Sequence, residues 1–410
     1  MSDYIKHITC VTDNFPDGQK ICAARIEYDR AIDPGKLDPA SFEVAGRHIT
    51  GIHAEGNEVV LDLDILDPAA FIIPEPKGPG PKGKGPGGPG GPGGPGKPPM
   101  GGPPKLPAVS RAPRTVTVIQ KGDVTAADGG AIPGRGEAMV SDRAEEPIIE
   151  DFRQFEFGGL GYNLYAPKGQ KPGERYPLVV FIHDAGPCGD DTKITLSQGG
   201  GAVVWAKPAW QKEHPCFVLA PQIPRHVKLT MDSFEVSDEL EILKSMIDDV
   251  AAKYPIDTDR IYATGQSMGC MAFCELNIRY PDYFAASLLV AGQWSPERMA
   301  EKCAGNKLWI LVSEHDEKAF PGMNAVTDAM ERVGARVGRY KWDAKASPEE
   351  LDKLAAEAMQ DDVNIRYTVF DGSSVVPPWK DDNPATNHVC TWAKAYTIRG
   401  LMEWLFSNKK

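Results

Sequence analysis

The stretch Arg260-Ile-Tyr-Ala-Thr-Gly-Gln-Ser-Met-Gly-Cys270 decides how the second half of this chain is expected to fold. A β-rich run leads directly into Gly265-Gln-Ser-Met-Gly269, and an apolar pattern of helical period follows over residues 268–279. In that context the pattern glycine-x-serine-x-glycine predicts a sharp strand-to-helix turn that presents the hydroxyl of Ser267 at the edge of a sheet. The flanking glycines avoid side-chain clashes, and the start of the helix favours negative charge beside the serine.

Alternating strand and helix patterns extend from this turn in both directions, after about residue 150. Several of the strand candidates are continuous apolar runs, as expected for parallel strands that are covered on both faces. The pattern predicts an α/β fold, a doubly wound, mostly parallel sheet of eight strands. The expected strands are 152–157, 161–166, 176–183, 216–220, 260–264, 286–291, 308–313 and 364–370, and the expected helices are 237–253, 268–279, 324–333, 348–359 and 391–406.

A serine hydroxyl needs a base to take its proton, and the base needs an orienting group. In folds with this turn the acid and the histidine follow the serine in that order. Asp316 comes just after the apolar run 308–313, and His388 is the only histidine beyond it, in a segment expected to be a loop before the last helix. We therefore expect Ser267 as nucleophile, Asp316 as acid and His388 as base, with Glu314 and Glu317 as alternative acids.

The attack on a carbonyl carbon produces an oxyanion that needs hydrogen-bond donors. One donor is expected to be the backbone N–H of Met268, directly after the nucleophile. The second is expected from the loop over residues 181–189, with Ala185 as first choice and Gly186 as the alternative. Asp184 stands in this loop where many hydrolases carry glycine.

The first 145 residues have a different pattern, with short alternating runs at 20–28, 41–44, 57–64 and 114–120. Such runs separated by turn residues predict a small all-β sandwich over residues 1–145, ahead of the α/β domain over 146–410. Between two of these runs, 26 of the 34 residues from 74 to 107 are Gly or Pro, with almost nothing apolar among them. We expect a disordered insertion in a loop of the sandwich.

Composition excludes several classes of protein. The net charge of −12 argues against a nucleic-acid surface, and no run approaches the ~20 apolar residues of a membrane span. The eight cysteines and the remaining histidines show no metal-binding spacing, so no metal ion and no cofactor is expected. No signal peptide is visible, which indicates a cytoplasmic protein, or a secreted one if the sequence is a mature form; export would allow a disulfide between Cys10 and Cys22.

The second half of the chain resembles bacterial carboxylesterases related to polyhydroxybutyrate depolymerases and feruloyl esterases, in particular those with an N-terminal immunoglobulin-like domain. The matching segments are Gly161-Tyr-Asn-Leu-Tyr-Ala-Pro167, His183-Asp-Ala-Gly186, Phe217-Val-Leu-Ala-Pro-Gln222, Gly265-Gln-Ser-Met-Gly269, Ser313-Glu-His-Asp316 and His388 with Trp392. The resemblance implies an α/β-hydrolase whose nucleophile, acid and base fall on Ser267, Asp316 and His388. It implies a serine esterase that works through an acyl-enzyme intermediate, and it does not explain the Gly/Pro insertion.

The expected partner is a small-molecule ester with a short or aromatic acyl group. Feruloyl or acetyl esters on plant polysaccharide are a more specific alternative, a serine peptidase is another, and a non-enzymatic binding module is a third. Trp205 and Trp210 either shape an acyl pocket or belong to the core. The sandwich is expected to bind carbohydrate, to cover the active-site mouth or to join copies of the chain in a homo-oligomer, and the sequence does not decide among these roles.

Overall fold

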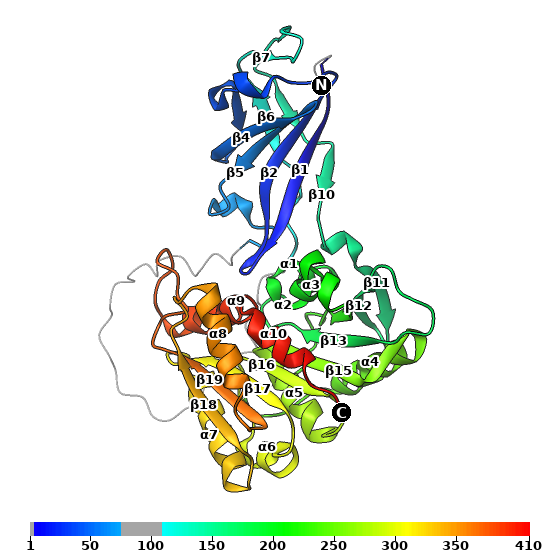
Figure 1. Cartoon of the computed structure of the whole chain (residues 1–410), viewed down its shortest axis with the longest axis vertical. Coiled ribbons are helices and arrows are strands. Elements are labelled where there is room, and N and C mark those ends of the chain that lie inside the picture. The colour runs from blue at the N-terminus through cyan, green and yellow to red at the C-terminus, as the bar shows by residue number, and fades with distance from the viewer. Residues whose placement is uncertain (1–3, 75–108) are drawn as a thin grey trace, which may run out of the picture.

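The computed structural model describes residues 4–74 and 109–410, and it has two parts (Figure 1). The expected disordered insertion at 74–107 lies outside the described residues, apart from its first residue. The strands up to residue 145 form small sheets, whereas those from residue 153 onward form one large sheet with helices on its faces.

The first part contains a five-stranded sheet of order β10-β1-β2-β5-β4 and a three-stranded sheet of order β3-β6-β9, with a short β7–β8 pair. Apolar side chains of both sheets share one buried cluster. In β5 buried and half-buried residues alternate, which is the pattern of a strand with one face on the core. The strands are β1 Ile5–Phe15, β2 Gly18–Tyr28, β3 Phe42–Val44, β4 Ile49–Glu55, β5 Glu58–Leu63, β6 Thr117–Gln120, β7 Val124–Thr125, β8 Ala131–Ile132, β9 Ala138–Val140 and β10 Arg143–Glu145.

The large sheet has nine strands, in the order β11-β12-β14-β13-β15-β16-β17-β19-β18. At one edge β12 pairs antiparallel with both β11 and β14, and the pairs from β14 to β18 are parallel. The strands are β11 Arg153–Phe157, β12 Leu160–Tyr165, β13 Tyr176–Ile182, β14 Phe217–Pro221, β15 Ile256–Gln266, β16 Ala286–Val290, β17 Leu308–Ser313, β18 Val337–Trp342 and β19 Ile365–Phe370.

The predicted count of eight strands is wrong by one, because β18 was missed. This strand lies at the edge of the sheet and pairs with β19 alone. Its sequence, VGRYKW, alternates polar and apolar residues, and only Trp342 is buried. An edge strand is not covered on both faces, so it lacks the continuous apolar run that identified its neighbours.

The helices cover both faces of the sheet (Figure 1). The predicted helices 268–279 and 348–359 have the observed bounds, but the single helix expected over 391–406 is two helices, α9 and α10. Asn383 caps α9 and Pro384 is its first residue, so the helix begins earlier than its apolar pattern suggested. The helices are α1 Ile194–Ser197, α2 Gly200–Val203, α3 Pro208–Glu213, α4 Glu239–Lys253, α5 Met268–Arg279, α6 Pro296–Cys303, α7 Ala319–Arg332, α8 Pro348–Met359, α9 Pro384–Ala395 and α10 Arg399–Phe406.

The tip of the β1–β2 hairpin joins the two parts of the molecule at α1 and α2 (Figure 1). Gln19, at the start of β2, is buried and accepts a hydrogen bond from Ser197 Oγ at 2.8 Å. Its Nε2 donates to Thr12 Oγ1 at 2.8 Å and to Glu146 Oε2 at 2.9 Å. The junction is therefore a buried polar network that fixes the hairpin against the α/β part.

Trp205 and Trp210 belong to the core, although Trp210 also borders a small cavity of about 300 Å³. They are 0% and 4% exposed. Both rings pack against Phe406 of α10, with centroids 5.9 and 5.0 Å away.

Candidate active site

Ser267 stands between β15 and α5, in a backbone conformation that serine rarely adopts. Its φ is 50° and its N–H donates to Val290 O at 3.0 Å, which holds the turn. A Cβ on Gly265 would lie 2.7 Å from the carbonyl carbon of Gly269, and one on Gly269 would lie 1.9 Å from Ile182 O. Only glycine fits at these two positions, which explains the glycine-x-serine-x-glycine pattern.

The imidazole of His388 lies between Ser267 and Asp316. Its Nε2 is 2.9 Å from Ser267 Oγ, and its Nδ1 is 2.5 Å from Asp316 Oδ2. The ring also packs edge-on against Trp392, one helical turn later, with centroids 5.1 Å apart. His388 lies in α9 and not in the loop expected from the sequence, so the helix itself fixes the position of the imidazole.

Asp316 is 3% exposed and lies three residues beyond the end of β17. Its Oδ1 accepts hydrogen bonds from the N–H groups of Lys318 and Ala319, at 3.0 and 2.9 Å. Burial alone would raise the pKa of this carboxyl, but the hydrogen bond and charge of His388, with the two N–H donors, bring the pKa below its usual value. An ionised Asp316 keeps the proton of the neutral imidazole on Nδ1, which leaves Nε2 free to accept from Ser267.

The two alternative acids lie elsewhere. Glu314 accepts from the N–H of Gly372 and forms an ion pair with Lys341, and these contacts lower its pKa. Glu317 is exposed. Of the three acidic residues in this loop, Asp316 is the one that contacts His388.

The expected oxyanion donors lie in two segments that the hydrogen bond between Gln266 and Asp184 joins. Met268 is the first residue of α5, so its N–H has no partner within the helix. In the loop after β13, the N–H of Gly186 donates to Asp184 Oδ2 at 3.0 Å. That bond engages Gly186, the alternative donor, and favours Ala185 as the second donor.

Sequence reasoning missed the polar network that holds this loop beside the serine. Gln266 donates through Nε2 to Asp184 Oδ1 at 2.8 Å and to Gln198 Oε1 at 3.2 Å. The buried His183 accepts from the N–H of Ile223 at 2.9 Å through Nε2, and burial lowers the pKa of its imidazole. The one sign of this network in the sequence was Asp184, which stands where many hydrolases carry glycine. Its hydrogen-bond partners could not be recognised from the sequence.

A cleft of about 620 Å³ opens beside the triad, between the two parts of the molecule. Ser267, Asp316 and His388 are not among its lining residues, but Trp392, whose ring packs against His388, is. Asp184 and Gln198, also in the lining, both accept hydrogen bonds from Gln266, the residue before Ser267. The lining is mainly apolar and comes from the β1–β2 hairpin, the loop after β5, the loop after β19 and α9. Its residues are Phe15, Pro16, Asp17, Lys20, Ile65, Leu66, Asp184, Gln198, Val375, Pro377, Trp379, Lys380, Val389, Cys390, Trp392, Ala393, Lys394 and Thr397.

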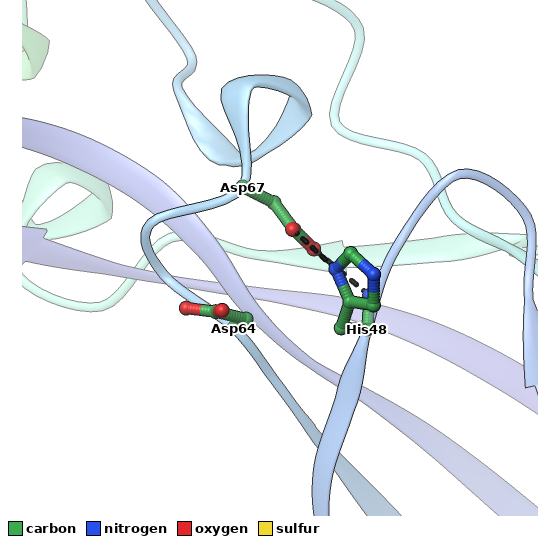
Figure 2. A group of neighbouring side chains, drawn as sticks. All are labelled: His48, Asp64 and Asp67. Atoms are coloured by element: carbon green, nitrogen blue, oxygen red, sulfur yellow. Dashed lines mark hydrogen bonds and ion pairs between the residues drawn. The ribbon is translucent and has the colours of Figure 1, made fainter.

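Two groups in the described part of the chain have side chains close enough to share a metal ion: His48 with Asp64 and Asp67, and Glu213 with His214 and Glu403. In the first, Asp67 is 2.7 Å from His48 Nδ1 (Figure 2) and also pairs with Arg47 Nε at 3.2 Å. The guanidinium already balances the charge of Asp67, so these residues fit an internal ion pair better than a metal site.

The cysteines form no disulfide in this structure. All eight cysteines are described and none is bridged, so the disulfide between Cys10 and Cys22 that export would allow is not formed. Among residues 4–74 and 109–410, no helix has the length and apolar character that crossing a membrane requires.

The protein has a mostly parallel sheet and a serine in a strand-to-helix turn, and Asp316 and His388 follow this serine in the chain. These features together define the α/β-hydrolase class. The chain has the α/β-hydrolase fold, preceded by an N-terminal immunoglobulin-like domain. Residues 7–133 match the family described as the esterase immunoglobulin-like N-terminal domain.

The crystal structure of a thermostable esterase is similar over 99% of this chain and 100% of its own, with 25% identity and a TM-score of 0.76. Poly(3-hydroxyalkanoate) depolymerase C of Paucimonas lemoignei is 28% identical over 143 residues, 33% of this chain and 32% of the depolymerase. The chain thus matches about a third of the length of that curated relative. A feruloyl esterase module from Clostridium thermocellum matches less well, with 15% identity over 61% of this chain and 88% of its own and a TM-score of 0.37.

Proposed function

We propose that this protein is a serine carboxylesterase in which Ser267 is the nucleophile, His388 the general base and Asp316 the orienting acid. The observation that carries the proposal is the continuous contact of the three side chains, 2.9 Å from Ser267 Oγ to His388 Nε2 and 2.5 Å from His388 Nδ1 to Asp316 Oδ2. Both distances suit proton transfer through the imidazole.

In the first half of the reaction, His388 takes the proton of Ser267 as Oγ attacks the ester carbonyl. The negative charge on the carbonyl oxygen is held by the N–H groups of Met268 and Ala185. His388 then gives its proton to the departing alcohol, and the acyl group stays on Ser267.

In the second half, water enters beside the acyl group and His388 takes its proton. The hydroxide attacks the acyl carbon, the same N–H groups hold the oxyanion, and Ser267 recovers its proton as the acid leaves. The ionised Asp316 stabilises the positive charge that the imidazole carries in both halves.

The substrate class proposed is carboxylic esters with short or aromatic groups. The cleft of about 620 Å³ beside the triad supports it, because its volume and apolar lining suit such groups. Of the five large apolar side chains exposed in the described residues, Leu66, Trp379 and Val389 line this one cleft. Feruloyl or acetyl esters on plant polysaccharide are a narrower form of the same proposal.

The test is hydrolysis of p-nitrophenyl esters from acetate to octanoate, together with methyl ferulate, by the wild type and by Ser267→Ala. We expect activity in the wild type and its loss in the variant, with a chain-length profile that reports the space beside the triad. Activity that survives in Ser267→Ala would assign the nucleophile elsewhere. A wild type that is inactive on every ester but cleaves p-nitroanilide peptides would favour the peptidase alternative.

A further inference from the structure

One cationic side chain of the cleft, Lys394, has no protein acceptor for its ammonium among the described residues, beyond the favourable effect of a cation at a helix C-terminus. Lys394 lies in the last turn of α9, six residues after His388, and lines the cleft. Its side chain is partly buried, and among the described residues its ammonium makes no ion pair and no hydrogen bond. Burial lowers the pKa of this ammonium, and Asp343 counteracts this only by longer-range attraction.

Three other charged side chains of the lining, Asp17, Lys20 and Asp184, have partners within the protein. Lys20 is 2% exposed, pairs with Asp17 at 2.9 Å and lies 4.4 Å from the ring centroid of Phe71. Asp184 accepts from Gln266 and from Gly186. Lys394 therefore differs from these residues, as a partly buried cation without a protein acceptor among the described residues.

Partial burial of an ammonium beside apolar walls costs free energy, which an anionic partner offsets. A hydrogen bond between an ammonium and an anion is also stronger than one between neutral groups. A ligand that is apolar along its length and anionic at its end satisfies both the walls and the lysine. Lys394 lies about 9 Å along the axis of α9 from His388 and about 120° around it, so the ammonium and the imidazole are on different faces of the helix. A ligand that reaches both groups therefore needs a chain of several carbons between its ester and its anion.

We propose that the cleft binds esters that carry a carboxylate at the far end of an apolar chain, and that Lys394 is the residue that selects for this carboxylate. The inference rests on the proposed function, because it names the substrate class of the same site. The carboxylate belongs either to the acyl half or to the alcohol half of the ester, and the experiment separates the two.

The acyl half is tested with the p-nitrophenyl monoester of octanedioic acid against p-nitrophenyl octanoate. The alcohol half is tested with the acetate ester of 8-hydroxyoctanoic acid against octyl acetate, followed by acid release at constant pH. In each pair we take the ratio of kcat/KM for the charged ester to that for the neutral one, in the full-length wild type, Lys394→Met, Lys394→Arg and Lys353→Met. Lys353 is an exposed lysine of α8 and serves as the matched control.

We expect the ratio in one pair to fall about tenfold in Lys394→Met, as for one charge-assisted hydrogen bond at a partly exposed site. The ratio should be largely kept in Lys394→Arg and unchanged in Lys353→Met. The pair that responds identifies the half of the ester in the cleft. A ratio that Lys394→Met leaves unchanged in both pairs overturns the proposal.

A binding measurement separates this inference from the proposed function. Calorimetry with Ser267→Ala and with Ser267→Ala/Lys394→Met uses two ligands without an ester, octanedioic acid monoamide and octanamide. Tighter binding of the charged ligand that depends on Lys394 supports the charge selection even if no ester is hydrolysed. Ester hydrolysis without any charge preference in binding leaves the esterase proposal in place and rejects the role of Lys394.

Discussion

Gln266 Nε2 donates a hydrogen bond to Asp184 Oδ1 over 2.8 Å, and this bond ties the residue before Ser267 to the loop that follows β13. The second oxygen of Asp184 accepts from the N–H of Gly186 at 3.0 Å. One carboxylate thus fixes the spacing between the turn that carries Ser267 and the loop that carries Ala185, on which an oxyanion hole depends.

Asp184→Asn should lower kcat for p-nitrophenyl acetate about tenfold with little change in KM. An amide has only one acceptor oxygen, so it cannot hold both the Gln266 and the Gly186 donors, and the oxyanion donors lose their alignment. Steady-state kinetics checks this, with Asp190→Asn, an exposed residue just beyond the loop, as the control. An unchanged kcat would show that the loop keeps its shape without the carboxylate.

Asp316→Asn should lower kcat about 10⁴-fold, because an amide in place of the buried carboxylate favours the wrong tautomer of His388. Circular dichroism should show the fold retained. Glu314→Gln and Glu317→Gln are the matched controls, and each should stay within a few-fold of the wild type. A large loss in either control with a small loss in Asp316→Asn would move the acid to that residue.

Asp316→Asn should also change the response to acid. The pKa of Asp316 is lowered in the folded protein, so its ionised form stabilises the fold above the unfolded value of about 4, and this stabilisation is lost as pH falls through the folded pKa. The free energy of unfolding of the wild type should therefore fall more steeply below about pH 4 than that of the variant. Urea denaturation from pH 3 to 7 compares the two slopes, and parallel curves would contradict the expectation.

Gly269→Ala should abolish activity and destabilise the fold by more than about 3 kcal/mol, because the new methyl group would overlap a backbone oxygen. Its Cβ would lie 1.9 Å from Ile182 O, in the tightest part of the turn. Gly305→Ala is the control, since nothing lies within 4 Å of a Cβ at that position. Thermal and urea denaturation of both variants check the difference, and equal stability of the two would refute the packing argument.

Gln19→Ala should lower the free energy of unfolding by about 1–3 kcal/mol, because it leaves the buried Ser197 hydroxyl and the Glu146 carboxylate with fewer partners. Gln154→Ala, at an exposed position of β11, should be within about 0.5 kcal/mol of the wild type. Urea denaturation followed by circular dichroism compares the two. Equal midpoints would mean that the hairpin tip contributes little to the stability of the junction.

The sequence alone determined the elements whose local pattern is strong. The turn at Ser267 was predictable because only glycine fits two residues before and two residues after it. The helices α5 and α8 have the predicted bounds because the apolar periodicity and the flanking residues indicate the same ends. The edge strand β18 was not found, since a strand paired on one side only has no continuous apolar run. The division of 391–406 into two helices was missed because the start signal, Asn383-Pro384, lay ahead of the apolar pattern.

Only the tertiary structure decided which acid meets His388, since Glu314, Asp316 and Glu317 are equivalent carboxylates until the loop after β17 is folded. It also revealed the network of Asp184 and Gln266, the cleft between the two parts, and the position of Lys394, which has no ion pair among the described residues. These features depend on contacts between residues that are far apart in the chain. Local sequence patterns encode the period and the ends of an element, whereas a contact across 80 or more residues exists only once the sheet has brought both segments to the same edge.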